Sequence, residues 1–291
     1  MTDTAMTDSV LLLAAYDTQL RLDAEAQGAL ARRRIRWEAD DAGVGLELMV
    51  AVFTGRSGFI STGPLGEDPA RIREALAEPS VIAALVRFGL ESVRELAGEE
   101  GLATLEWKTR SHDALPGLHE ALLAEGFEAG EEESVMIGRA EALAVEVPLP
   151  EGITLRPVRT EADALALCLA AEEAFEGDPA NAPRRAADLM ARLANGTGVE
   201  AWMALADGSV VSGGRLEPVP GTDFAGIWGG FTLLPWRGQG IYRALTARRA
   251  RTALESGVTL VNSDSTDYSR PILERYGFTR VTGTTPYELT F

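Results

Sequence analysis

Two segments that lie far apart in the chain follow the same plan. The segment EWKTRSHDALPGLHEALLAEGFEAGEEESVMIGR predicts the end of a strand, an amphipathic helix that stops at Gly126-Phe127, and a strand near residues 135–137. The segment NSDSTDYSRPILERYGFTRVTGTTPYELT repeats this order, with Gly277-Phe278 and a strand near residues 287–289. The distance from the Gly-Phe pair to the last strand agrees to within about one residue, which indicates an internal duplication.

A proline-rich stretch separates the two halves. The stretch EVPLPEGITLRP, residues 146–157, holds three prolines and a glycine between two patterned regions. A chain of 291 residues also matches two domains at roughly 150 residues each. We therefore predict a first module at residues 1–145, a linker at 146–152 and a second module at 153–291.

The second half alternates strand and helix patterns. It reads as a strand at 153–158, a helix with the capping-box pair Thr160 and Asp163, a helix beginning at Pro183, a hairpin turning at Asp207-Gly208, a strand through FAGIWGGFTLL, a helix ending at Gly257, a strand at 258–264, the short helix SRPILERY and the strand TPYELTF. This order predicts a mixed α/β (α+β) fold around a single sheet flanked by helices.

The stretch LLPWRGQGIYRAL, residues 233–245, joins a predicted strand to a predicted helix. The first turn of a helix has N–H groups without intrahelical partners and a partial positive charge, and Gly238 and Gly240 let a ligand approach those amides. Arg243 stands at the unfavourable end of the helix dipole, at a cost of ~0.3–1 kcal/mol unless an anion compensates it. With Arg237, this pattern predicts a pyrophosphate site; the alternative is an ordinary turn with solvated arginines.

Other nucleotide-binding motifs are excluded. The chain contains no G-x-x-x-x-G-K-[ST], and RGQGIYR lacks the third glycine of the dinucleotide fingerprint. An acidic residue about 20 positions after the loop, which would bind a ribose, is also missing from its expected place.

The same loop carries a resemblance to a known family. PWRGQGIYRAL after an apolar strand, followed by strand, short helix, Gly-Phe and strand, resembles the GCN5-related N-acetyltransferase (GNAT) superfamily over residues 152–291. Arg237 and Gly240 match its coenzyme motif Arg/Gln-x-x-Gly-x-Gly/Ala, whereas Tyr242 stands at the sixth position, where the family has glycine or alanine. Over residues 1–145 the resemblance is partial. It therefore implies two GNAT-like modules in tandem, the first of them degenerate.

The resemblance also implies a cofactor and a reaction. It implies acetyl-CoA as co-substrate, no metal, and direct transfer of the acetyl group to a primary amine of a small molecule or peptide. The pantetheine arm is assigned to Phe231, Thr232, Leu233 and Leu234, and the pyrophosphate to Arg237, Gly238, Gln239, Gly240, Ile241, Tyr242 and Arg243. The alternative is a catalytically silent acyl-CoA-binding or regulatory module.

Two positions depart from the family pattern. The tyrosine that protonates the leaving sulfur in the family falls on Leu273, and the preceding asparagine falls on Thr266. Asp264 is a candidate general base, with a turn aspartate as its alternative. Tyr287 is a candidate acid or pocket wall, with core packing as its alternative. Trp228 is either an aromatic floor for an amine or a buried core residue.

The charge and composition of the chain limit the classes of partner that we expect it to bind. The formal net charge of −17 argues against a nucleic-acid-binding surface. The apolar stretch VLLLAAY is too short to span a bilayer, and no signal peptide is recognisable, so we expect a cytoplasmic protein without a membrane partner. The single cysteine, Cys168, forms no internal disulfide and reads as a core residue. A duplicated chain is compatible with a monomer or a homodimer.

Overall fold

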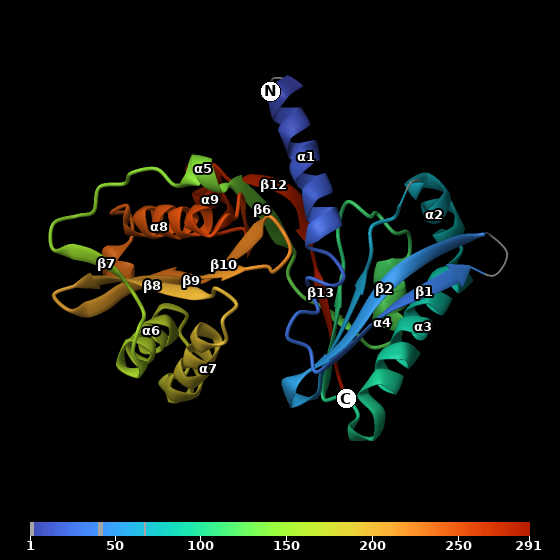
Figure 1. The fold of residues 1–291 in the computed structure, drawn as a ribbon. Coiled ribbons are helices and arrows are strands. Elements are labelled where there is room, and N and C mark those ends of the chain that lie inside the picture. The colour runs from blue at the N-terminus through green and yellow to red at the C-terminus, as the bar shows by residue number, and fades with distance from the viewer. Residues whose placement is uncertain (1–2, 40–42, 67) are drawn as a thin grey trace. The chain divides into compact units, whose positions relative to one another are not determined.

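The computed structural model describes residues 3–39, 43–66 and 68–291. It divides into two compact units. Unit 1 comprises Met1–Val135, Asp264–Arg270 and Arg280–Phe291, and unit 2 comprises Met136–Ser263 and Pro271–Thr279. Two mixed sheets flanked by helices build the chain, as expected (Figure 1). No helix in the described ranges is long and apolar enough to cross a bilayer.

The six-stranded sheet belongs to unit 1. Its order is β1-β2-β3-β4-β13-β5, with β3 and β4 parallel and the other neighbours antiparallel. The first half of the chain contributes α1 (Asp3–Gln19), β1 (Ala31–Ala39), β2 (Val44–Phe53), β3 (Ser57–Thr62), α2 (Pro69–Leu76), α3 (Pro79–Ala97), β4 (Thr104–Lys108), α4 (Leu118–Ala124), β5 (Glu128–Ala129) and β6 (Glu133–Arg139).

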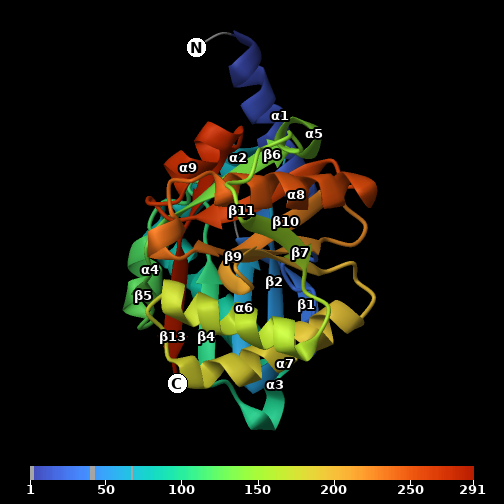
Figure 2. The same ribbon diagram turned by 90° about the vertical axis from the view of Figure 1, so that its left-hand side faces the viewer.

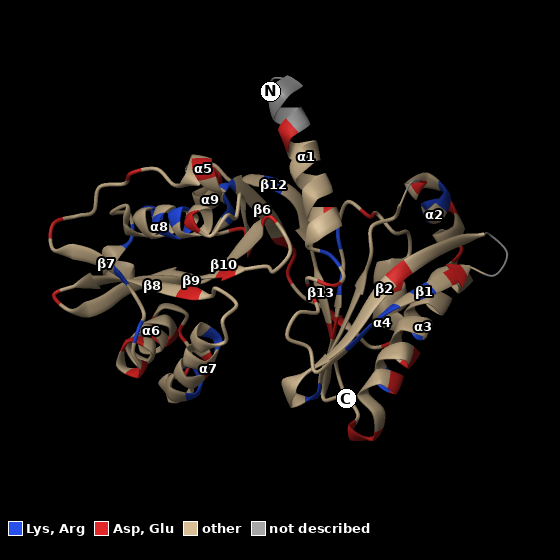
Figure 3. Cartoon of the chain, viewed as in Figure 1, with Lys and Arg blue, Asp and Glu red and all other residues tan. Residues whose placement is uncertain are grey.

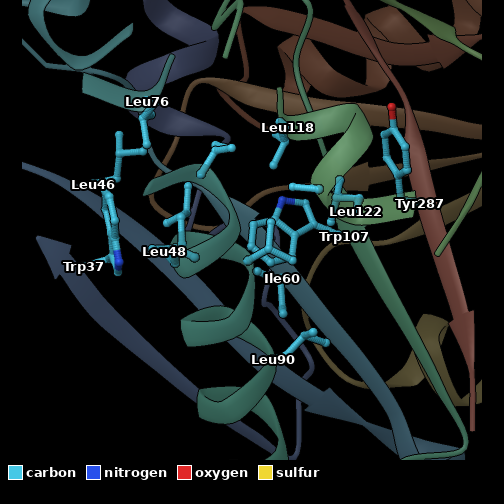
Figure 4. Packing of buried hydrophobic residues seen from close by; sticks show 14 of the residues in the cluster. Trp37, Leu46, Leu48, Ile60, Leu76, Leu90, Trp107, Leu118, Leu122 and Tyr287 are labelled. Carbon is cyan, nitrogen blue, oxygen red and sulfur yellow. The ribbon is translucent and has the colours of Figure 1, made fainter. Parts of the chain in front are cut away.

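The core of unit 1 lies between this sheet and helix α3. Figure 4 shows Ile60 and Trp107 packed with leucines from α3 and α4. The indole of Trp107 is fully buried, and Gly89 on α3 makes room for it, because a Cβ there would lie 2.7 Å from the ring. The tryptophan therefore depends on a close approach of helix and sheet.

The seven-stranded sheet has the order β12-β6-β11-β10-β9-β8-β7. Helices α6 and α7 cover one face of its unit 2 strands and α8 covers the other (Figures 1 and 2). The second half contributes α5 (Ala140–Leu143), β7 (Ile153–Pro157), α6 (Glu161–Ala174), α7 (Ala182–Ala194), β8 (Glu200–Ala206), β9 (Ser209–Pro218), β10 (Phe224–Thr232), α8 (Ile241–Glu255), β11 (Leu260–Ser265), α9 (Arg270–Tyr276), β12 (Thr279–Thr284) and β13 (Pro286–Thr290).

Several local predictions are confirmed. Thr160 and Asp163 form both hydrogen bonds of a capping box at the start of α6. The hairpin between β8 and β9 turns at Asp207 and Gly208, whose φ angles are 47° and 82°. Helix α8 ends just before Gly257, which has a φ of 82°. These features depend on neighbours in the sequence, which is why the sequence predicts them.

The final strands correct the prediction of a single sheet for the second half. Strand β13 lies between β4 and β5 in the sheet of unit 1, and β6 takes the equivalent place between β11 and β12 in the seven-stranded sheet. Residues 279–284 also form a strand, β12, that the sequence pattern did not predict. An alternating pattern indicates a strand, but it does not say which sheet the strand joins. The duplicated halves thus exchange their last strands.

Three glutamates stand side by side in the sheet of unit 1. Glu288 on β13 is directly opposite Glu106 on β4 and Glu128 on β5. Burial raises the pKa of Glu106; the Lys108 ammonium opposes this shift, and the Glu288 carboxylate adds to it. The ionised form of Glu106 is therefore disfavoured in the folded protein.

Replacing Glu106 by glutamine is expected to raise the free energy of unfolding at pH 7 by ~0.2–1 kcal/mol, because like charges directly opposite one another are destabilising. A carboxyl whose pKa is raised by folding stabilises the folded protein through its protonated form. This stabilising contribution is complete below the unfolded pKa of about 4.3, and it is lost as the pH rises through the folded pKa. Urea unfolding at pH 4 and pH 7 should therefore show a flatter pH dependence for Glu106→Gln. Glu131→Gln, at an exposed position, is the control. A variant no more stable than the parent at pH 7 would contradict this.

Candidate functional site

Strands β10 and β11 of the seven-stranded sheet pair over only part of their length. Their parallel register joins residues 224–226 to residues 260–262 and ends at Gly226 and Asn262. Strand β10 nevertheless continues to Thr232. Beyond Gly226, the backbone edge of β10 that faces away from β9 has no ladder partner on β11. An unpaired strand edge can bind an extended ligand through main-chain hydrogen bonds.

The fork between β10 and β11 holds two notable side chains. Asn262 is buried, and its Oδ1 has no hydrogen-bond partner among the described residues. The half-buried indole of Trp228 folds back over Gly226. An unpaired buried acceptor costs about 1–3 kcal/mol, so Asn262 Oδ1 is free to accept a hydrogen bond from a donor that enters the fork.

A β-bulge shapes β10 just beyond the fork. The register with β9 shifts between Trp228 and Phe231, so that Gly229 and Gly230 together oppose Gly214. Gly229 has a φ of 58°, which favours glycine. The bulge turns the unpaired edge of β10 away from a regular ladder.

Helix α8 supports the bulge from one face of the sheet. The hydroxyl of Tyr242 packs against Gly230, where a side chain would collide with it. The guanidinium of Arg249 is fully buried and lies against Gly214. Arg249 donates from Nη1 to the main-chain oxygen of Arg215 at 3.2 Å. Gly230 of the bulge therefore accommodates Tyr242, which stands where the motif discussed above has a small residue.

The loop after β10 forms the start of α8. Gly240 is the residue that precedes the helix, and Gly238 and Gly240 have φ angles of 76° and 82°. A Cβ on either glycine would meet no atom within 4 Å, so the space above them is open. Nε of Arg237 donates to the carbonyl oxygen of Thr232 at 2.9 Å and ties the loop to the strand.

The main-chain amides of this loop face no acceptor. In the part of the chain that the structure describes, the N–H groups of residues 238–243 have no hydrogen-bond partner. Ile241 is buried and anchors the first helical turn, whereas Arg237 and Arg243 are exposed. Unpaired amides, the positive end of a helix dipole and two arginines are a combination that can bind an anion. The donor set fits a pyrophosphate.

The two parallel strands of unit 1 form no such fork in the part of the chain that the structure describes. Strands β3 and β4 pair along residues 57–61 and 104–108, almost their full length. The carbonyl oxygens of Thr62 and Gly63, just after β3, accept hydrogen bonds from Nη2 of the buried Arg21 at 2.7 and 2.9 Å. Arg21 is in turn paired with Asp113. Helix α3 begins after the acidic Glu78, which would repel an anion.

The two candidate catalytic residues lie in unit 1, whereas the loop lies in unit 2. Tyr287 is a core residue, as Figure 4 shows, and its hydroxyl is 2.8 Å from Nδ1 of His119. Burial raises the pKa of Tyr287, which makes it a weaker acid. Asp264 forms an ion pair with Lys108 at 2.8 Å. Burial alone would lower the pKa of Lys108, but the Asp264 carboxylate raises it above its ordinary value.

Leu273 lies in the core of unit 2 with only 2% of its surface exposed. Its carbonyl oxygen accepts the N–H of Phe278 at 3.1 Å, as Leu122 does for Phe127 at 3.1 Å in the first half. The two leucines are therefore equivalent packing residues of the duplicated helix, and no acid stands at this position.

A cavity that the sequence analysis missed lies beside the bulge. It has a volume of about 260 Å³, opens to solvent, and is lined by residues of α6, α7, β9 and β10 within unit 2. Its walls include Phe231 and Gly229 from β10 and Arg215 from β9. Helix α7 contributes Arg185, Asp188 and Arg192, at the spacing i, i+3, i+7 that places side chains on one helix face. The spacing of these three residues is the sequence signal from which a charged face of the helix could have been predicted.

Solved structures of GCN5-related N-acetyltransferases are similar to this chain. No protein family model matches the sequence, and no curated protein matches it. A GCN5-related N-acetyltransferase from Kribbella flavida has a TM-score of 0.61 at 20% identity, covering 91% of this chain and 93% of its own. One from Sphaerobacter thermophilus has a TM-score of 0.59 at 19% identity, covering 87% and 83%. The chain has the GNAT fold.

The tandem character of the fold is also supported. A tandem GNAT protein from the clavulanic acid biosynthesis pathway covers 99% of this chain and 96% of its own length, with a TM-score of 0.59 at 17% identity. Both sheets of the present chain take part in this likeness, since it spans nearly the whole sequence. The two sheets are thus consistent with two GNAT modules in tandem. Among the described residues, the fork and the open amide loop lie in the second half of the chain.

Proposed function

We propose that the chain is an acetyl-CoA-dependent N-acetyltransferase with its coenzyme site in unit 2. The observation that carries the proposal is the row of unpaired amides at residues 238–243 beside an unpaired edge of β10, within a GNAT fold. The acceptor is a primary amine of a small molecule or peptide. Nucleic acid is a poor partner for a chain of net charge −17.

The residues of unit 2 divide the coenzyme between them. The amides of residues 238–243 and the guanidinium groups of Arg237 and Arg243 hold the pyrophosphate. The unpaired edge of β10, residues 227–232, binds the extended arm as a neighbouring strand would, and Asn262 accepts a hydrogen bond from one of its amides. The coenzyme supplies an acetyl group activated as a thioester.

The protein's part in the transfer is to position the amine and stabilise charge. The neutral amine nitrogen bonds to the acyl carbon, the carbon–sulfur bond breaks, and one proton passes from the nitrogen to water. An N–H on the unpaired edge of β10 donates to the oxygen on which negative charge develops. A thiol with a pKa of about 8.5 leaves tolerably as a thiolate, so the leucine at position 273 is compatible with turnover.

The proposal is tested with a panel of primary amines, acetyl-CoA and a thiol reagent, beside calorimetry with coenzyme A. We expect one coenzyme per chain, because β3 and β4, the parallel strands described in unit 1, do not fork. We also expect amine-dependent release of thiol. Coenzyme binding without turnover on any amine would support the silent alternative, which the buried Leu273 favours. No binding of the coenzyme would refute both.

A further inference from the structure

We propose that the cavity beside the β10 bulge binds acceptor amines that also carry a carboxylate, as a free amino acid does. The inference rests on the proposed function, because it names the acceptor class of the same site. It is drawn from the charges that line the cavity and from their position next to Gly229 and Phe231.

The ion pairs around the cavity leave one guanidinium in excess. Glu217 is shared by two arginines, Arg192 and Arg215. The other basic residue of the wall, Arg185, is matched by the buried Glu172 at 3.0 Å. The remaining acid, Asp188, is exposed and paired with Arg184 at 3.5 Å. Basic residues of α7 are among those drawn in blue in Figure 3. A single carboxylate between Arg192 and Arg215 leaves a positive charge that a second carboxylate would neutralise.

Arg215 is the residue placed to receive that carboxylate. Its Nε donates to Glu217 at 2.8 Å, while Nη1 and Nη2 have no hydrogen-bond partner among the residues that the structure describes. Nη1 lies over Gly229, 2.7 Å from where a Cβ would be. A guanidinium whose two terminal NH2 groups are free can bind a carboxylate through two parallel hydrogen bonds.

The position of Arg215 sets the distance between the two ends of the acceptor. Arg215 is the ladder partner of Trp228, and the register shift begins immediately after that pair. The amine must reach the unpaired edge of the same few residues of β10. Strand residues are spaced by about 3.3 Å, so a carboxylate held by Arg215 and an amine at the bulge belong to one small molecule.

The size and charge of the cavity favour a small acceptor that carries a carboxylate. Its volume of about 260 Å³ is below the ~300–1,000 Å³ of sites for drug-sized ligands, which favours a small acceptor over a folded or extended peptide. Arginines in the wall disfavour a polycationic amine, although the whole chain is acidic. One aromatic surface, Phe231 in edge contact with Phe175, is available to an apolar side chain.

The test compares acceptors that differ only in the carboxylate. Each standard amino acid is assayed beside its primary amide and its decarboxylated amine, with acetyl-CoA and a thiol reagent. We expect the amino acid that reacts fastest to exceed its own amide and amine by at least about tenfold in kcat/KM, since hydrogen bonds to charged groups are the stronger ones. In Arg215→Gln this preference should fall by a similar factor, mostly through KM for the amino acid. Equal rates for the three forms would overturn the inference.

Two further measurements keep the outcome decisive. Arg33→Gln is the matched control, because Arg33 is an exposed strand arginine of unit 1 paired with Glu95, and it should leave the preference unchanged. If no amine is acetylated, calorimetry of the amino acids against the coenzyme-bound protein separates the two proposals. Binding of amino acids but not of their amides would uphold the inference while the transfer reaction fails, and binding of neither would refute it. Arg192→Gln repeats the test should Arg215→Gln not fold.

Discussion

Replacing Gly240 by leucine is expected to raise the dissociation constant for coenzyme A by at least about 100-fold, or ~2.7 kcal/mol. Gly240 has a φ of 82° and no atom within 4 Å of the place where its Cβ would stand. That open space is where the pyrophosphate approaches the amides in our proposal. A leucine side chain would occupy it and would also strain the backbone at the start of α8.

The strain and the lost space can be separated with a matched control. Gly257, at the other end of α8, also has a φ of 82° and open space around its Cβ position. Gly257→Leu should therefore lower stability to a similar degree, by ~1–2 kcal/mol for the unfavourable φ, and leave coenzyme affinity unchanged. Calorimetry with coenzyme A measures both variants. Unaltered affinity in Gly240→Leu would refute the placement of the pyrophosphate.

Replacing Arg21 by methionine is expected to lower the free energy of unfolding by ~3–5 kcal/mol, because removing one partner of a buried pair leaves an uncompensated charge. The Arg21 side chain is fully buried and holds Asp17 at 2.9 Å and Asp113 at 2.7 Å. It also donates to the carbonyl oxygens of Thr62 and Gly63. Burial alone would lower the pKa of Arg21, but the Asp113 carboxylate raises it. Urea unfolding is the measurement.

The double variant Arg21→Met with Asp113→Asn tests the cause. The Asp113 carboxylate loses its buried partner in Arg21→Met. Replacing it by the neutral amide of asparagine should restore part of the lost free energy of unfolding, because an amide needs no counter-ion. Arg36→Met removes an exposed ion pair with Glu38 and should change stability by about 1 kcal/mol or less. A loss in Arg21→Met no larger than in Arg36→Met would show that the buried network does not stabilise unit 1.

The candidate site was predictable in part. The glycines of RGQGIYR, the strand before them and the helix after them are local features, so their pattern predicts an amide loop at a helix start. The fork between β10 and β11 was not predictable from these residues, because it depends on where the backbone of β11 diverges after Asn262. The unpaired Oδ1 of Asn262 follows from that divergence and is equally invisible in the sequence.

The environments of the two candidate catalytic residues were also predictable only in part. The sequence raised core packing as the alternative for Tyr287, and the structure places Tyr287 in the core of unit 1. Asp264 could be recognised as the end of a strand, but its partner, Lys108, is 156 positions away. Long-range pairs of this kind depend on the fold, and no local pattern encodes them.

Four features could be predicted from the sequence alone. They are the duplicated order of elements, the capping box of Thr160 and Asp163, the turn at Asp207-Gly208, and the loop at Gly238 and Gly240. Each depends on the dihedral preferences and hydrogen bonds of residues close together in the chain. Only the tertiary structure decided the exchange of β6 and β13, the bulge that accommodates Tyr242, and the arginine-lined cavity. Those features arise from which strand edges pair and which side chains then meet, and period-two alternation leaves that choice open.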